Sequence, residues 1–242
     1  MERKEKLKKP LIKKNFIMDE LSFGDLTQWD PPQGEPEPQS QDELVHLFPT
    51  PLLISQYHFD YSKELEWIKN QSYKKQKTFN RQSEDTFILD KPEMSRVRQF
   101  IDSKIKEFVF KVMGSDAEMV ITQSWLNRNG KGESHHEHKH TNSMISGVWY
   151  PQIHEKLPPI RFKTSEQRDV SFRIKRYNTY NSQSFMLPIK VGELILFPSN
   201  LQHSVPTNQS DEERISLSFN TWCKGSMGDE KSLTYLPFDR LM

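Results

Sequence analysis

The chain has 242 residues, a length that suits one large domain or two small ones. Its 34 Lys and Arg nearly balance its 33 Asp and Glu, which argues against a protein that coats nucleic acid, because such proteins carry a strong basic excess. The sequence has no run of about 18 apolar residues that could span a bilayer. Its charged start predicts no secretion, and its single cysteine, Cys223, allows no intrachain disulfide. We expect a cytoplasmic protein in a reducing compartment.

The first 45 residues differ in composition from the rest. Residues 1–15 hold seven basic and two acidic residues, whereas residues 16–45 hold eight acidic residues and no Lys or Arg. Four prolines between positions 31 and 38 oppose both helix and sheet in this stretch. We therefore expect an N-terminal arm over residues 1–45, which is either simply solvated or docks a protein partner, and a folded domain over residues 46–242.

Two packing helices are expected near the start of the folded domain. A short strand around residues 46–55 precedes helical patterns at residues 63–73 and 92–113. In the longer pattern one apolar stripe recurs at helical spacing, formed by Val97, Ile101, Ile105, Phe108 and Val112. A proline opens this pattern and a glycine follows it, as is typical of helix boundaries.

From residue 120 onward the pattern changes to short strands separated by turn residues. The predicted strands are residues 120–127, 144–150, 160–163, 170–175, 184–187, 193–197 and 214–220. Many short strands after two helices predict a mostly β fold, a sandwich or barrel with helices on its outside.

Five of the eight histidines cluster in the middle of the chain, at His135, His136, His138, His140 and His154. Neutral imidazole is a common ligand of transition metals, so the cluster indicates a metal site. If the segment is extended, His138 and His140 share one face and can bind one ion together. If it is helical, His136, Glu137 and His140 spell the H-E-x-x-H zinc motif, although the helix propensity on both sides is poor. A solvated histidine-rich loop is the third alternative.

A further ligand and an anion-binding residue lie later in the chain. His203 lies in a strand–turn–strand context, and Arg214 opens a strand of strictly alternating polar and apolar residues. One face of that strand carries Arg214, Ser216, Ser218 and Asn220, and the other carries Ile215, Leu217 and Phe219. An arginine beside a hydroxyl on an inward face suits a carboxylate, because the planar guanidinium can bind both oxygens.

The order of these motifs resembles that of the Fe(II)- and 2-oxoglutarate-dependent oxygenases. The chain presents His138-Lys-His140, then His203, then Arg214-Ile-Ser216, within a series of short strands. It is most similar to the small 2-oxoglutarate-Fe(II) oxygenases of marine phages and bacteria, over roughly residues 46–222.

The resemblance implies a double-stranded β-helix, or jelly roll, with two N-terminal packing helices and Fe(II) at its mouth. By the resemblance, the metal ligands are His138, His140 and His203, and the residues that bind the co-substrate 2-oxoglutarate are Arg214, Ser216 and Tyr150. This chain departs from the family pattern at His140, where most relatives have an acidic residue. Sites with three histidines are also similar to those of cupin dioxygenases, which do not use 2-oxoglutarate, but Arg214 and Ser216 favour the 2-oxoglutarate interpretation.

Two functions follow from these patterns. The first is a dioxygenase that oxidises a C–H bond of an unknown substrate, with a protein side chain as the candidate by analogy. The basic segment of residues 160–180 is either the rim of a site for an anionic substrate or an ordinary exposed hairpin. The alternative function is a catalytically weak or inactive oxygenase-fold protein that serves as a component of a phage or other assembly, which allows a virion-associated location.

Overall fold

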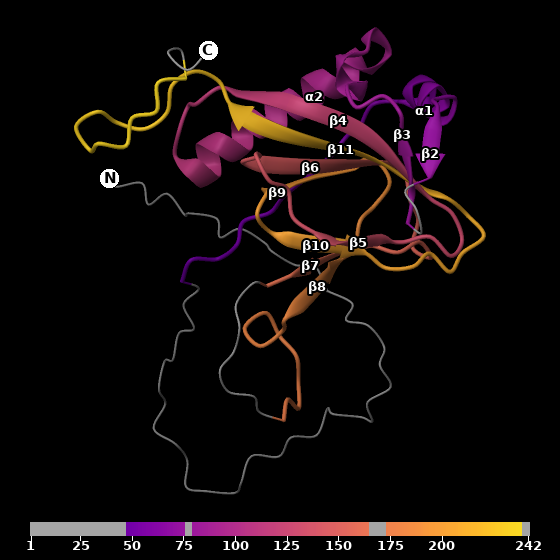
Figure 1. Cartoon of the computed structure of the whole chain (residues 1–242). Coiled ribbons are helices and arrows are strands. Elements are labelled where there is room, and N and C mark those ends of the chain that lie inside the picture. The colour runs from indigo at the N-terminus through magenta and orange to yellow at the C-terminus, as the bar shows by residue number, and fades with distance from the viewer. Residues whose placement is uncertain (1–46, 76–78, 165–172, 239–242) are drawn as a thin grey trace, which may run out of the picture. The chain divides into compact units, whose positions relative to one another are not determined.

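The computed structural model describes residues 47–75, 79–164 and 173–238 (Figure 1). The arm predicted at residues 1–45 lies outside these ranges, so its role and its boundary with the folded domain stay predictions. No helix in the described ranges is long and apolar enough to cross a membrane.

Two antiparallel sheets form the centre of the described structure and lie one above the other in Figure 1. The seven-stranded sheet has the order β1 (Leu53–Gln56), β9 (Glu193–Pro198), β6 (Ile145–Gln152), β11 (Arg214–Cys223), β4 (Met119–Asn129), β3 (Arg81–Ser83) and β2 (Tyr73–Lys75). The four-stranded sheet has the order β5 (His135–His138), β10 (Gln202–Val205), β7 (Ile160–Lys163) and β8 (Ser184–Leu187). Neighbours in both sheets are mostly distant in sequence, as in a jelly roll, and the predicted fold class is confirmed.

The central strands of the larger sheet are buried on both faces. β9 is a nearly continuous apolar run, which is typical of a strand covered on both sides. β11 alternates in polarity, and yet its residues from Arg214 to Phe219 are all buried. It pairs with β4 on one side and β6 on the other, so it lies in the middle of the sheet. Its polar face is therefore enclosed within the protein.

The helices cover the outer face of the larger sheet (Figure 1). α1 spans Ser62–Lys69, and α2 spans Ser95–Phe108 after short 3-10 turns at Ile88–Asp90 and Pro92–Met94. The four leading members of the predicted stripe are buried in the core beneath α2. The fifth, Val112, is 43% exposed, which corrects the prediction. It lies in a π-helical turn, Val109–Met113, whose wider winding brings Val109 into the core instead.

Most predicted strands are present with small shifts at their ends. Residues 160–163 and 184–187 match β7 and β8 at both ends. The strand predicted at residues 170–175 is wrong for residues 173–175, which are exposed and form no strand, because no neighbouring strand pairs with them. Residues 170–172 lie outside the described ranges. The short strands β2 and β3 were not predicted, since they carry few apolar residues.

Two apolar clusters form the core of the described structure. The first joins the helices to the outer face of the larger sheet, with Leu126, Trp149 and Phe219 among its members. The second fills one part of the space between the two sheets, where Val148, Phe162 and Phe197 pack. The remaining part of that space is lined by polar side chains.

Candidate metal centre

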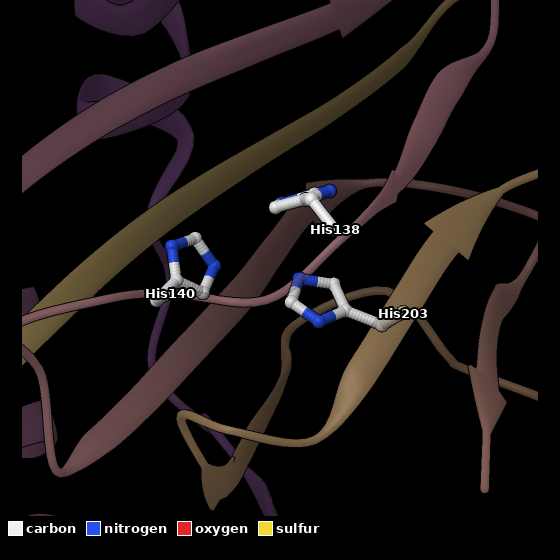
Figure 2. Close-up of side chains that lie close together, drawn as sticks. All are labelled: His138, His140 and His203. Atoms are coloured by element: carbon white, nitrogen blue, oxygen red, sulfur yellow. The ribbon is translucent and has the colours of Figure 1, made fainter. Parts of the chain in front are cut away.

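Three histidines from two segments of the chain meet between the sheets (Figure 2). His138 ends β5, His140 lies in the turn that follows, and His203 lies in β10 directly opposite His138. One ring nitrogen of each lies within 4.8 Å of those of the other two. That arrangement could hold one metal ion, because three imidazoles can coordinate one face of it and leave the other face open.

The extended conformation of this segment decides between the sequence alternatives. β5 is a strand, so the zinc-helix interpretation of His136 and His140 is wrong. Glu137 points away from the three rings and pairs with Lys163 at 3.1 Å. The solvated-loop interpretation of this segment is also wrong for His138 and His140, which are half-buried and lie against His203. His154 lies apart from the cluster and pairs with Glu212 at 2.7 Å.

Backbone carbonyl groups orient two of the three rings. Nδ1 of His138 lies 2.8 Å from the carbonyl oxygen of His136, and Nδ1 of His203 lies 2.9 Å from that of Leu201. A carbonyl oxygen only accepts, so Nδ1 must carry the proton in both rings. Nε2 of each ring therefore keeps its lone pair, which is the state that binds a metal.

Burial keeps these imidazoles neutral. Loss of solvent, together with the neighbouring imidazoles, lowers the pKa of His203 to about 3 and that of His140 to about 4. Burial also lowers the pKa of His138. A group whose pKa lies well below 7 is uncharged near neutral pH, so these rings can act as ligands without first losing a proton.

Arg214 lies deep in the same interior. It opens β11, pairs in register with Asn129 of β4, and is only 2% exposed. Its Nη1 lies 3.2 Å from Oγ of Ser216 and 3.5 Å from Oδ1 of Asn129, and its guanidinium lies 5.0 Å from the ring centre of Tyr150. No described carboxylate forms an ion pair with it, and burial lowers its pKa. A buried cation without an anion is costly, which indicates that an anionic ligand belongs beside it.

Three buried polar atoms around Arg214 lack a partner within the described structure: its own Nε, Nδ2 of Asn129 and Oη of Tyr150. Each such group costs about 1–3 kcal/mol, so a cluster of them calls for an explanation. All three can donate a hydrogen bond, because burial raises the pKa of Tyr150 to about 12 and keeps its hydroxyl protonated. A carboxylate, which offers only acceptors, fits this set of donors.

One narrow cavity connects the two clusters. Its lining includes His138, His140 and His203 at one end and Tyr150 and Arg214 at the other. A wider cleft of about 310 Å³ adjoins His138 and His140 but not His203, and its lining also includes Phe79, Asn80, Gln82, Trp125 and Asn127. The three imidazoles and the donors around Arg214 thus line one cavity of about 20 Å³, and the wider cleft lies beside it.

Six residues of this cavity were predicted by the resemblance: His138, His140, His203, Arg214, Ser216 and Tyr150. Neither Asn129 nor the residues other than histidine that line the cleft were predicted. Asn129 is on the same face of β4 as Trp125 and Asn127, so alternation could have grouped them. Their place beside Arg214 depends on the pairing of β4 with β11, which are about 85 residues apart in the chain. No local pattern indicates that pairing.

Comparisons with known proteins find one matching family and several solved structures of similar fold. Residues 123–220 match the family described as "Putative 2OG-Fe(II) oxygenase", where 2OG denotes 2-oxoglutarate. No curated protein matches the chain. The matched range, residues 123–220, contains His138, His140, Tyr150, His203 and Arg214.

Solved structures share the fold at low sequence identity. An oxidoreductase of the 2OG-Fe(II) oxygenase family from Burkholderia pseudomallei is 13% identical, with a TM-score of 0.52 over 70% of this chain and 83% of its own. HygX from Streptomyces hygroscopicus, solved with nickel, 2-oxoglutarate and hygromycin B, is 11% identical, with a TM-score of 0.53 over 71% and 82%. SnoN, an α-ketoglutarate-dependent epimerase from nogalamycin biosynthesis, is 10% identical, with a TM-score of 0.55 over 73% and 80%. Residues 123–220 are thus similar to the 2OG-Fe(II) oxygenases, and the solved structures share the fold of the chain.

Proposed function

We propose that the protein is a non-haem Fe(II)- and 2-oxoglutarate-dependent dioxygenase of the hydroxylase type. In this reaction one oxygen atom of O₂ enters a C–H bond of the substrate. The other oxygen atom enters 2-oxoglutarate, which loses CO₂ and becomes succinate. The observation that carries the proposal is the single cavity with three convergent imidazoles at one end and unpaired donors around a buried arginine at the other.

The residues present fit both groups. His138, His140 and His203 would hold the metal through nitrogen atoms that the fold leaves unprotonated in at least two of the rings. A bound Fe(II) supplies the dioxygen chemistry, which amino-acid side chains cannot perform. HygX was solved with both a metal and 2-oxoglutarate, which supports the same pair here.

The chain itself binds and orients the co-substrate. Arg214 and Ser216 would hold the distal carboxylate, and the Tyr150 hydroxyl and the Asn129 amide would donate to it as well. The surrounding apolar cluster excludes water from this end, which strengthens each of these charge-assisted bonds.

We propose the wider cleft as the path of the substrate, with a protein side chain as the candidate class. Phe79 and Trp125 give it apolar walls, and Asn80, Gln82 and Asn127 give it carboxamides. No Asp, Glu, Lys or Arg lies among the described residues that line it, so an uncharged part of the substrate suits its inner wall. The basic residues of 160–180 would act only outside it, and the arm at residues 1–45 would dock a partner.

The first test is binding under anaerobic conditions. Wild-type protein with Fe(II) and 2-oxoglutarate should show a charge-transfer absorption band in the visible range, and Arg214→Ala should lack it. Aerobic incubation with candidate peptides should then yield succinate in proportion to substrate oxidation. Protein that binds neither metal nor 2-oxoglutarate at millimolar concentration would contradict the proposal and favour an inactive component of an assembly.

The second test separates the arm from the site. Deletion of residues 1–45 should leave the absorption band unchanged and remove partner binding if the arm is a docking element. A weaker band after this deletion would show that the domain boundary is wrong.

A further inference from the structure

The polar face of β11 extends past Ser218 to Asn220, whose side chain reaches His140. Nδ2 of Asn220 lies 3.4 Å from Nδ1 of His140. On its other side the carboxamide oxygen of Asn220 accepts a hydrogen bond from Oγ of Ser146 at 2.8 Å. Asn220 thus connects the imidazole of His140 to the larger sheet.

His140 needs such a partner more than the other two rings do. It lies beyond the end of β5, and its backbone N–H donates to the carbonyl oxygen of Ser199 at 2.9 Å. The rings of His138 and His203 each have a backbone carbonyl at Nδ1, whereas Nδ1 of His140 has Asn220. The turn fixes the backbone of His140, and Asn220 is placed to fix the rotation of its ring.

A chain of buried hydroxyl groups holds Asn220 in place. Oγ of Ser146 lies 2.8 Å from Oγ of Ser199, which lies 2.7 Å from Oγ of Ser143. Ser146 and Ser199 are each 1% exposed. Ser143 in turn donates to the carbonyl oxygen of Thr221 at 3.3 Å. The network ties the carboxamide to β6, to β11 and to the turn after β9, so it cannot swing away without breaking buried hydrogen bonds.

We propose that Asn220 is a positioning residue for the metal centre, which orients His140 and binds its outer ring nitrogen. This inference rests on the proposed metal site. When Nε2 of His140 binds a metal, Nδ1 carries the ring proton and needs an acceptor. A carboxamide offers an oxygen and a nitrogen in nearly the same shape, and hydroxyl groups both donate and accept. With its carboxamide reversed, Asn220 accepts from Nδ1 of His140 through its oxygen and donates to Oγ of Ser146 through its nitrogen. The same hydrogen-bond network therefore suits the metal-bound state.

The neutrality of Asn220 has a consequence for metal affinity. No described carboxylate bonds to any of the three rings, so the centre has no negative charge from its outer partners. Metal-binding histidines are often paired with a carboxylate, which raises the basicity of the ring. Asn220→Asp would create that pair at the same position with almost the same shape.

The test uses Co(II), whose paramagnetism moves the ring N–H signals of bound histidines far from the rest of the proton NMR spectrum. Wild type should show three such signals in slow exchange with water. In Asn220→Ala one signal should be lost to exchange, and the Co(II) affinity should fall by about 10- to 100-fold. Asn220→Asp should keep all three signals and bind Co(II) at least as tightly as wild type.

Two further variants make the result specific. Thr122→Val is the matched control, because the exposed Thr122 bonds to the backbone oxygen of Asn220 at 3.3 Å and reaches no histidine. It should change neither signals nor affinity. Ser146→Ala leaves Asn220 in place without its anchor and should speed the exchange of the same third signal, which gives an answer even if Asn220→Ala does not fold.

Three protected signals and an unchanged affinity in Asn220→Ala would overturn the inference, and so would an unchanged exchange rate in Ser146→Ala. Wild-type protein that fails to bind Co(II) would instead overturn the proposed metal site.

Discussion

From Arg214 to Phe219, both faces of β11 are buried, and they are opposite in chemistry. Ile215, Leu217 and Phe219 are 0% exposed on one face and pack in the cluster that includes α2. Arg214 and Ser216 are 2% exposed on the other face and line the cavity. A single alternating strand therefore serves as both the centre of the core and a wall of the site.

The difference shows where the stability of the fold arises and where it is lost. Burial of an apolar side chain contributes about 1.5–3 kcal/mol, so the apolar face stabilises the sheet. Each unpaired polar atom around Arg214, on β11 and on the neighbouring strands β4 and β6, costs about 1–3 kcal/mol until a ligand binds it. The helices thus offset a destabilising site, which is a common relation between a scaffold and its functional residues.

The largest expected effect comes from truncation on the apolar face. Phe219→Ala should lower the free energy of unfolding by about 3–5 kcal/mol, because it removes a fully buried ring and leaves a cavity. Urea unfolding measures this loss. The affinity of the remaining folded protein for 2-oxoglutarate should be unchanged, and a parallel loss of affinity would show that the two faces are not independent.

Arg214→Met should have the opposite pattern. It should weaken 2-oxoglutarate binding by about 2–5 kcal/mol, since the carboxylate loses the buried guanidinium. Without ligand, the free energy of unfolding of the variant should be about 1 kcal/mol higher than that of wild type, because a buried charge without an anion is removed. Calorimetric titration and urea unfolding check the two effects, and a variant less stable than wild type would contradict the account of the polar face.

Gly147→Ala tests the packing between β6 and β11. A Cβ at Gly147 would lie 2.1 Å from Cζ of Phe219, so one of the two must move. We expect a loss of about 1–3 kcal/mol from overpacking. The double variant Gly147→Ala with Phe219→Leu should lose less than the sum of its two single changes, as measured in a double-mutant cycle. Additive losses would show that the ring is not the obstacle.

The smallest effects separate two tyrosines. Tyr150→Phe should raise the dissociation constant of 2-oxoglutarate about fivefold, equal to about 1 kcal/mol for one hydrogen bond, without loss of stability. Tyr73→Phe is the matched control, because its hydroxyl already donates to the carbonyl oxygen of Ile68 at 2.8 Å. It should lower stability by about 1 kcal/mol and leave 2-oxoglutarate binding unchanged. The reverse assignment would place the ligand elsewhere.

Local patterns predicted the elements that carry strong periodicity. The stripe of α2 and the alternation of β11 were legible, because each buried face recurs at the period of its element. The resemblance to the 2-oxoglutarate-dependent oxygenases predicted that His203 and Arg214 share one site, and both residues line the same cavity. The face that carries Asn220 was predicted too, although no role for its side chain was.

Features that depend on contacts between segments far apart in the sequence could not be predicted. Asn129 reaches Arg214 only through the register of β4 with β11, and the cleft gathers Phe79 and Trp125 from separate segments. The exposure of Val112 depends on a single π-helical turn, which a regular period cannot indicate. Tertiary contacts set these positions, and they leave little trace in a short stretch of sequence.

The central claim is that the three imidazoles and the arginine at the end of β11 form one site for a metal and a dicarboxylate. Anaerobic calorimetric titration of 2-oxoglutarate into protein with and without Fe(II) tests it directly. We predict one 2-oxoglutarate per chain, tighter binding with the metal than without it, and loss of this binding in Arg214→Met. Equal binding to wild type and to Arg214→Met would contradict the claim.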